Sequence, residues 1–122
     1  MPAFSERSKK NLETCDKRLQ DLFNEVIKYL DITIICGQRG EIEQNQAYDE
    51  GNSKLRFPDS KHNKTPSLAV DVAIYPIDYS NIRSFYYLAG YVQAIADRLG
   101  TPIKWGGSWK NFPDYDHWEL FT

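Results

Sequence analysis

Two stretches of helical periodicity, with short β-branched segments between and after them, most strongly limit the folds open to this chain. Apolar residues return at three- and four-residue steps over residues 12–30 and again over residues 79–99, a pattern typical of amphipathic helices. Asp16 offers an N-cap that would divide the first stretch into two helices. Gly100 stands where a helix C-terminus favours glycine, so we expect the second stretch to end at residue 99.

Short segments rich in β-branched and aromatic residues predict the strands. These segments cover residues 32–36, 68–74, 103–105 and 117–120, and residues 41–48 have the composition of a further helix. The polar, proline-containing residues 52–67 are predicted to form a long loop, which in a compact domain is more often functional than idle. This order of elements indicates the α+β class.

Length and charge limit the number of domains and the kinds of partner. The chain has 122 residues, of which 41% are hydrophobic, so we expect a single domain with one core over residues 1–122. The 15 basic and 17 acidic residues nearly balance and the basic ones form no long block, which argues against nucleic acid and anionic lipid as partners. No apolar run approaches the ~18 residues needed to cross a bilayer, so membrane insertion is not expected.

The N-terminal segment and the cysteines indicate a compartment. Residues 1–10 are polar and lack the apolar segment of a secretory signal, so we expect the protein in the cytoplasm in which it is made. Cys15 and Cys36 are too far apart for a CxxC pair, and in the cytoplasm they are expected to be free thiols, most simply buried ones.

The only two histidines, His62 and His117, lie in segments that also carry carboxylates. Asp71 is the one acidic residue of its apolar strand, and a carboxylate buried there needs a metal or an arginine as partner. Two imidazoles and one carboxylate make a three-ligand set for zinc with one coordination position left open. Asp114, three residues before His117, could activate water in that position. The sequence therefore predicts a zinc hydrolase.

Motifs spread over most of the chain carry a family resemblance. They are Gly37-Gln38-Arg39 with Gln44, Ser60-x-His62 with Ala69-x-Asp71, Lys104-Trp105-Gly106-Gly107-x-Trp109, and Asp114-x-x-His117-x-Glu119-Leu120. Together these motifs resemble the M15 group of zinc peptidases, and most closely the phage-type L-alanyl-D-glutamate peptidases that act as endolysins. The resemblance implies a small antiparallel sheet packed against helices, a zinc site at the sheet, and short cell-wall peptides containing a D-residue as substrates.

The resemblance also implies a role for each site residue. His62, Asp71 and His117 would hold one Zn²⁺ per chain. Asp114 would act as general base, and Arg39, a permanent cation with several donors, would stabilise the oxyanion that develops on the scissile carbonyl. The alternative for Arg39 is a structural ion pair.

Other residues of these motifs leave alternatives open. Asp116 competes with Asp114 as the base, and alternation in an extended segment does not choose between them, whereas the family spacing favours Asp114. Ser60 could orient a ligand or the substrate by hydrogen bonding, and Glu119, which shares the strand parity of His117, could support that ligand. Trp109 is equally a substrate platform or a packing residue. Trp105 and Trp118 are expected in the core.

One interval departs from the family pattern. Asp71 follows His62 by nine residues, where the family commonly has seven. Loop-closure entropy changes slowly with length, so we expect the two extra residues to alter the loop and its substrate contacts rather than the position of either ligand.

The motifs and the resemblance leave three functions open. The leading prediction is a monomeric peptidoglycan endopeptidase that cuts the L-Ala–D-Glu bond of stem peptides and lyses the host after a holin has permeabilised the membrane. A D-Ala-D-Ala carboxypeptidase or dipeptidase is the second, and it would need a group that grips a free carboxylate or ammonium, for which no dedicated cationic cluster is visible in the sequence. A non-catalytic wall-binding or virion module is the third, but binding alone does not require a base beside an open zinc position.

Overall fold

A four-stranded sheet in the order β1-β2-β4-β3 organises the chain, and each neighbouring pair of strands is antiparallel. The structure, a computed structural model, describes residues 2–121. The strands are β1 (Ile32–Cys36), β2 (Ala69–Ile74), β3 (Ile103–Trp105) and β4 (His117–Leu120). The helices are α1 (Glu6–Glu13), α2 (Lys17–Val26), α3 (Glu41–Asp49) and α4 (Ile82–Leu99), with short 3₁₀ helices η1 (Lys61–Asn63) and η2 (Gly106–Ser108). The predicted α+β class with a small antiparallel sheet is confirmed.

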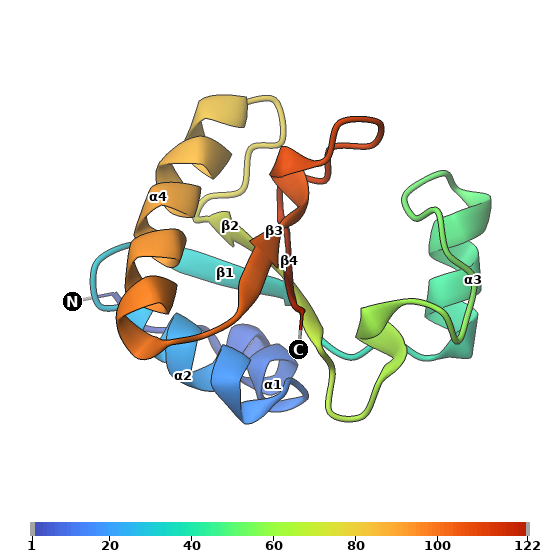
Figure 1. Cartoon of the computed structure of the whole chain (residues 1–122), viewed down its shortest axis with the longest axis horizontal. Helices are drawn as coiled ribbons and strands as arrows, with labels where there is room; N and C mark the ends of the chain where they lie inside the picture. Colours follow the sequence, from blue (N-terminus) through green and yellow to red (C-terminus); the bar gives the residue numbers. More distant parts are fainter. Residues whose placement is uncertain (1, 122) are drawn as a thin grey trace.

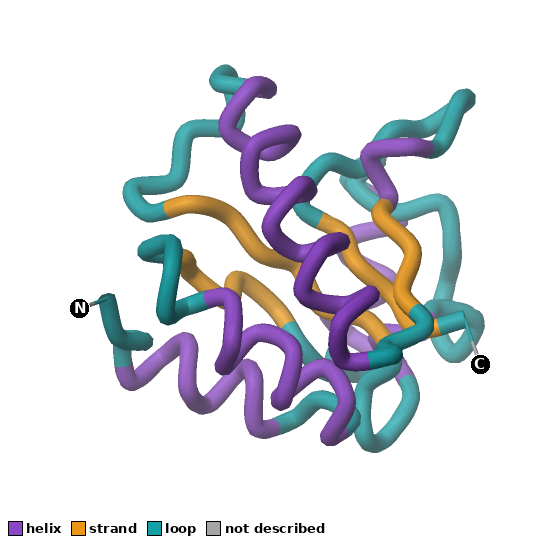
Figure 2. The backbone as a smooth tube through the Cα atoms, turned by 60° about the vertical axis from the view of Figure 1, so that its left-hand side comes forward, coloured by secondary structure: helices purple, strands orange, loops and turns teal. Residues whose placement is uncertain are grey.

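The helices are distributed unequally around the sheet. Figures 1 and 2 show α1, α2 and α4 packed together against the strands, while α3 stands apart at the other end of the molecule. The hydrophobic core joins side chains of α1, α2 and α4 to side chains of all four strands. Over the described residues 2–121, α3 contributes no side chain to this core.

Strand alternation separates a core face of the sheet from a polar face. The side chains buried in the core from the two central strands are Val70, Val72, Trp118 and Leu120. Asp71 and His117 alternate with these residues, so both point to the opposite face. A bulge between Ile34 and Cys36 shifts the register of β1, and as a result Cys36 stands opposite Asp71.

The first two helices follow their capping residues. Asp16 caps α2 as predicted. However, α1 begins at Glu6, well before residue 12, where the apolar pattern starts. The first turns of α1 are mostly polar, so hydrophobic periodicity could not reveal them. Ser8 is buried there, and its hydroxyl accepts a hydrogen bond from Ile34 N at 3.0 Å, which offsets the cost of burying a polar group.

The long helix α4 begins later than predicted and ends as predicted. Its first residue is Ile82 rather than Tyr79, because Asp78 forms a turn in which its side chain accepts from Ser80 N at 3.0 Å. Gly100 follows the last turn with a φ of 71°, the left-handed conformation expected of a C-terminal glycine.

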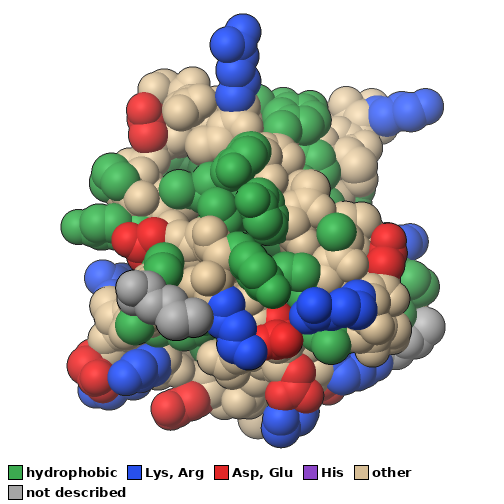
Figure 3. Space-filling view, turned by 90° about the vertical axis from the view of Figure 1, so that its left-hand side faces the viewer, with side chains coloured by type: hydrophobic (Ala, Val, Ile, Leu, Met, Phe, Trp, Pro, Cys, Tyr) green, Lys and Arg blue, Asp and Glu red, His purple; other side chains and the backbone are tan. Residues whose placement is uncertain are grey.

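The surface over α4 is rich in apolar side chains. Figure 3 shows hydrophobic groups gathered across this face, where no histidine is visible. Tyr86 and Tyr87 of α4 are both more than half exposed, whereas His62 and His117 are buried. Within residues 2–121, none of the helices combines the length and the hydropathy that a bilayer crossing requires.

Candidate metal and catalytic site

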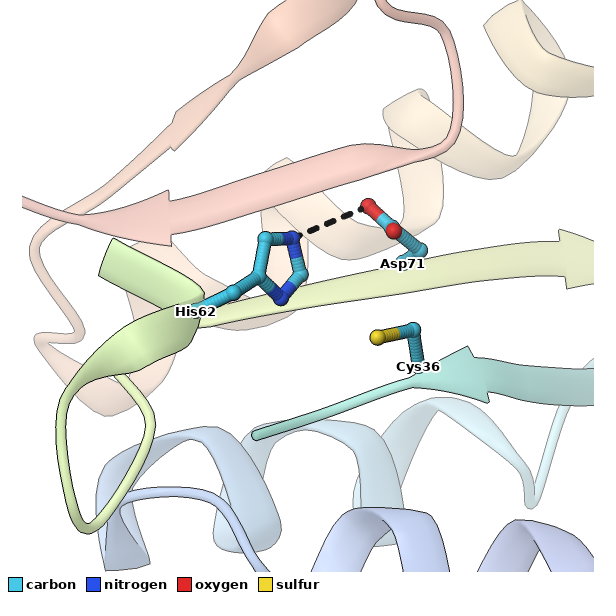
Figure 4. A group of neighbouring side chains, drawn as sticks. All are labelled: Cys36, His62 and Asp71. Carbon is cyan, nitrogen blue, oxygen red and sulfur yellow. Dashed lines mark ion pairs between the residues drawn. The ribbon is translucent and has the colours of Figure 1, made fainter. Parts of the chain in front are cut away.

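Three donor atoms from three separate elements converge on the polar face of the sheet. His62 Nε2 lies 3.2 Å from His117 Nδ1, and Asp71 Oδ1 lies 3.4 Å from each of these nitrogens. η1 carries His62, β2 carries Asp71 and β4 carries His117. Figure 4 shows the His62 ring directed at Asp71, with Cys36 beside them. The structure thus brings together the three residues predicted as metal ligands.

The sheet register positions two of the three donors. Asp71 and His117 are direct partners in the β2–β4 ladder, and partner side chains leave an antiparallel sheet on the same face. The long interval between His62 and Asp71 is taken up by the loop over residues 61–68, whose ends are joined by a hydrogen bond of 3.1 Å from Leu68 N to Lys61 O. The two residues by which this interval exceeds the family's usual seven therefore do not separate His62 from Asp71.

Hydrogen bonds fix the ring of His62. Ser60 caps η1, and its hydroxyl accepts from His62 N at 3.2 Å. Gly37 O lies 2.8 Å from His62 Nδ1, and since a carbonyl only accepts, Nδ1 carries the proton. A side chain at Gly37 would lie 2.3 Å from both Asn11 O and Thr14 Oγ1, so this close approach requires glycine.

Glu119 fixes the ring of His117. Its Oε1 lies 2.8 Å from His117 Nε2, and its Oε2 lies 3.0 Å from Lys61 Nζ. Burial would raise the pKa of Glu119, but the bonds to His117 and Lys61 outweigh burial and lower the pKa to about 2. An ionised carboxylate only accepts, so Nε2 carries a proton and the lone pair of Nδ1 is directed at Asp71 and His62.

This donor set fits a metal ion. Two imidazole lone pairs and a carboxylate oxygen at such short distances repel one another unless a positive charge lies among them. Asp71 Oδ1 is buried and has no hydrogen-bond partner within residues 2–121. Four ligands in a tetrahedron with bonds of about 2.0–2.1 Å are separated by about 3.3–3.4 Å. The observed separations of 3.2, 3.4 and 3.4 Å agree with that geometry.

Without a bound cation, the site holds a proton. Burial lowers the pKa of His117, but the carboxylates of Asp71 and Glu119 outweigh burial and raise it to about 9. Burial also opposes ionisation of Asp71, yet the two imidazoles hold the pKa of this carboxyl well below its usual range. A metal ion would have to displace the proton, so metal affinity should depend on pH.

Cys36 adds a sulfur atom beside these donors. Donor atoms of Cys36, His62 and Asp71 all lie within 4.8 Å of one another. Burial, followed by repulsion from Asp71, raises the pKa of the Cys36 thiol to about 11, so the thiol is neutral at pH 7. Both cysteines are free; Cys15 is buried as predicted, while Cys36 is only partly so.

A turn brings Asp114 back to the site. His117 N donates to Asp114 O at 3.2 Å, and Asp114 Oδ2 lies 4.0 Å from His117 Nδ1. Asp116 is in the same turn, where burial, repulsion from Asp71 and a hydrogen bond with Asp114 raise its pKa to about 8. Asp116 is therefore mostly protonated at pH 7 and can donate to Asp114, whereas Asp114 faces the donor cluster.

Arg39 lies at the same site and forms no ion pair with a carboxylate of residues 2–121. Its backbone is held by hydrogen bonds to η1, including one of 2.7 Å from Arg39 N to His62 O. Its Nε is buried without a hydrogen-bond partner in the described part of the chain. The guanidinium borders two cavities that it shares with Asp114. This environment differs from that of a structural ion pair.

A cavity of about 590 Å³ gives access to the site, and Arg39 and Asp114 also line a second cavity of about 510 Å³. Residues 52–62 form one rim of the larger cavity and residues 109–112 form the other. In Figure 1 these rims are the chain beside α3 and the loop after η2. Trp109 lies on the second rim, with its ring centroid 5.1 Å from that of His117. Trp118 is in the core and Trp105 packs against it, as predicted.

Sequence reasoning missed two residues that support this site. Lys61 binds Glu119 across 58 positions of sequence, and no local pattern signals such a pairing. Gly106 appeared only as part of a motif. A Cβ at Gly106 would lie 2.6 Å from Asp114 O and 3.0 Å from His117 Cβ, so the turn that carries both residues packs directly on this glycine.

Comparisons with known proteins identify a family and relatives for the chain. The sequence model of the family described as phage L-alanyl-D-glutamate peptidase matches residues 2–120. Peptidoglycan L-alanyl-D-glutamate endopeptidase CwlK of Bacillus subtilis (strain 168) is 34% identical over 108 residues, covering 76% of this chain. The match covers 62% of CwlK, so the chain spans less than two thirds of the length of this relative.

A solved structure supports the fold. The crystal structure of Serratia marcescens L-Ala D-Glu endopeptidase ChiX superposes with a TM-score of 0.83, covering 98% of this chain and 90% of ChiX at 24% sequence identity. At that identity the likeness establishes the fold. Because the family model matches residues 2–120, the chain belongs to the phage L-alanyl-D-glutamate peptidase family.

Proposed function

We propose that this protein is a zinc-dependent endopeptidase that hydrolyses the L-alanyl-D-glutamate bond of peptidoglycan stem peptides. The observation that carries the proposal is the convergence of His62 Nε2, Asp71 Oδ1 and His117 Nδ1 within 3.4 Å. The two histidines line the larger cavity and Asp71 lines the smaller one, and Asp114 and Arg39 line both. The family and the names of CwlK and ChiX support this choice of bond.

Zinc is the metal that best suits the donor set. Two imidazole nitrogens and one carboxylate oxygen make up a ligand set found in catalytic zinc sites. When bound, zinc supplies a Lewis acid that makes water nucleophilic at neutral pH. The hydrogen bonds from His62 Nδ1 to Gly37 O and from His117 Nε2 to Glu119 orient both rings for this purpose.

Asp114 is the proposed general base. Its Oδ2 is 4.0 Å from His117 Nδ1, so it is close enough to the donor cluster to accept the proton of an attacking water and then deliver it to the leaving amine. Asp116 is the weaker candidate, because it is mostly protonated at pH 7 and also accepts a hydrogen bond from the Tyr79 hydroxyl at 3.4 Å. Its proton can be shared with Asp114 and so help to orient that carboxylate.

Arg39 is the proposed oxyanion stabiliser. The Arg39 Nε is buried without a hydrogen-bond partner among residues 2–121 and is therefore an unused donor, and Arg39 lines both cavities together with Asp114. Donors already in place where negative charge develops lower the barrier without reorganisation. The scissile carbonyl would therefore lie between Arg39 and the donor cluster.

The larger cavity suits a short anionic peptide. Its volume of about 590 Å³ lies within the range of ligand pockets, roughly 300–1,000 Å³. Lys54 and Lys110 stand on its two opposite rims and have no ion pair to a carboxylate in the described part of the chain. Stem peptides carry free carboxylates beside the scissile bond, and cations at the rims favour such a substrate.

Mass spectrometry of muropeptides tests the proposal directly. Purified sacculi digested with the zinc-loaded protein should yield muramyl-L-alanine and peptides with a new amino terminus on D-glutamate. Chelator and Asp114→Asn should each suppress both products. Release of D-alanine alone would instead identify a carboxypeptidase, and intact sacculi after prolonged digestion would contradict a peptidase function.

We also propose that the activity serves host lysis, since the family is described as a phage family. Expression of the protein in a Gram-negative host should then leave cells intact until the inner membrane is permeabilised. Lysis should follow permeabilisation with the wild type and fail with Asp114→Asn. Equal lysis with both proteins would contradict this role.

A further inference from the structure

We propose that Lys61 is a positioning residue of the metal site, holding Glu119 in place and thereby fixing the ring of His117. The inference rests on the proposed metal site and adds a residue that the sequence did not single out. Among residues 2–121, the Lys61 ammonium bonds to Glu119 and to Leu120 O rather than to any of the three donor atoms, so its effect would pass through Glu119.

The contacts form a continuous chain. Lys61 Nζ lies 3.0 Å from Glu119 Oε2, and the other oxygen of the same carboxylate, Oε1, lies 2.8 Å from His117 Nε2. The Lys61 ammonium also donates to Leu120 O, the carbonyl next along β4. Both carboxylate oxygens of Glu119 therefore have a partner, and Lys61 also bonds to the backbone of the strand that carries Glu119.

The ion pair between Lys61 and Glu119 also connects the two segments that carry the histidines. Lys61 precedes His62 in η1, while Glu119 and Leu120 follow His117 in β4. In the described part of the chain, β4 pairs with β2 and β3, and no backbone hydrogen bond joins η1 to β4. The Lys61 bridge thus ties the segment of one histidine to the segment of the other.

Burial decides whether this ion pair has an appreciable effect. Exposed pairs contribute little because water screens them. Here the Glu119 side chain is 18% exposed and that of Lys61 is 35% exposed, so the pair is partly shielded. A carboxylate that accepts from a ligating imidazole sets the ring's orientation and tautomer, and loss of such a partner typically weakens metal binding about 10- to 100-fold.

The matched variants are Lys61→Met, Lys61→Arg and Lys64→Met. Methionine keeps much of the length of lysine without its charge, and arginine keeps the charge. Lys64, three residues along the chain, is exposed and forms no side-chain bond to residues 2–121, so it controls for loss of a lysine from this loop. Zinc affinity is measured by competition with a chromophoric chelator, and the visible spectrum of the Co²⁺-loaded protein reports on ligand geometry.

Five outcomes are expected of these variants. Lys61→Met should weaken zinc binding roughly 10- to 100-fold and alter the Co²⁺ spectrum. Lys61→Arg should restore most of the affinity, and Lys64→Met should stay within about twofold of wild type. Glu119→Gln should weaken binding by itself, and adding Lys61→Met to it should cause little further loss, because both changes interrupt the same chain of contacts.

Other results would overturn the inference. Wild-type affinity in Lys61→Met would do so, as would losses that multiply in the double variant. If Lys61→Met does not fold, Lys61→Gln removes the charge with a polar side chain and decides in the same way. Failure of the inference is distinguishable from failure of the proposed function, because the function is judged by muropeptide products of the wild type and the inference by metal affinity of the variants.

Discussion

Two carboxylates of one turn, Asp114 and Asp116, meet different surroundings and should respond differently to substitution. Asp114 faces the donor cluster, whereas burial, Asp71 and a hydrogen bond with Asp114 raise the pKa of Asp116 to about 8. Asparagine retains the size of aspartate but cannot accept a proton as a base does. The two Asp→Asn variants therefore separate the base from its neighbour.

Asp114→Asn should keep its zinc and lose roughly 10²- to 10⁴-fold in kcat, the usual contribution of a general base. Asp116→Asn should lose much less, because an amide can still donate to Asp114. Steady-state kinetics on a soluble stem peptide, with zinc content measured on the same samples, checks both. A near-normal rate in Asp114→Asn together with an inactive Asp116→Asn would mean that the base is Asp116.

Arg39→Lys separates transition-state stabilisation from architecture. Lysine keeps the charge but cannot reproduce the planar set of donors, so kcat should fall roughly 10²-fold or more while zinc content and the thermal unfolding midpoint stay near wild type. Paired measurement of kcat and thermal unfolding is required. A normal kcat in a destabilised variant would show that Arg39 has a structural role.

The sequence could indicate the donors and, as one alternative, Ser60 and Glu119 as their supports, but it could not indicate Lys61 or Cys36. His62 and His117 stood out because they are the only histidines, and Asp71 because it is acidic in an apolar strand. The choice of Asp114 over Asp116 depended on family spacing, since the two lie in a turn where strand alternation does not apply. Lys61 and Cys36 reach the site through a long-range ion pair and a bulge, and neither leaves a local pattern in sequence.

The turn between β3 and β4 depends on Gly106. A methyl group there would press on Asp114 O and His117 Cβ, and displacement of reacting groups by about 1 Å can lower a rate about 10²-fold. Gly106→Ala should therefore reduce both zinc affinity and kcat. Gly90→Ala in the middle of α4 is the control, since nothing lies within 4 Å of the added methyl.

The control has an expected result of its own. Alanine inside a helix is about 0.5–1 kcal/mol more favourable than glycine, so Gly90→Ala should raise the unfolding midpoint without affecting activity. Chemical denaturation and metal titration of both variants provide the comparison. If Gly106→Ala binds zinc and turns over as well as Gly90→Ala does, the close packing at the turn has no functional consequence.

The predicted elements agree with the structure where periodicity or caps are strong. The Asp16 cap between α1 and α2, the four strands and the end of α4 before Gly100 all occur as expected. The early start of α1 was missed because its first turns carry few apolar residues, and η1 was missed because a three-residue helix is too short to show a period. Local signals specify such elements only weakly.

The folded protein as a whole should lose stability with rising pH when zinc is removed. The pKa of Asp116 is raised from 3.8 to about 8 and that of His117 from 6.5 to about 9, so the folded state binds more protons than the unfolded state. Stabilisation from each group is complete below its unfolded pKa and is lost as pH rises through its folded pKa. The lowered pKa of Asp71 has the opposite effect. Its stabilisation is complete above the usual pKa of aspartate and is lost only as the pH falls below that value.

The unfolding midpoint in chelator should therefore be lower at pH 8.5 than at pH 5.5, with a free-energy difference on the order of a few kcal/mol. Zinc bound at the proposed site would replace the proton on His117, so the zinc-loaded protein should lose less stability over the same pH interval. Differential scanning calorimetry at the two pH values, with and without zinc, checks the prediction. A chelated protein that is more stable at pH 8.5 would contradict the assigned protonation.

Zinc content per chain tests most directly the account that three converging donors make this protein a metallopeptidase. Protein purified without chelator is assayed by elemental analysis beside His62→Ala, Asp71→Ala and His117→Ala, with circular dichroism to confirm that each is folded. The account predicts one zinc per wild-type chain and strongly reduced zinc in each folded variant. Equal zinc in the wild type and all three variants, or none in an active wild type, would contradict it.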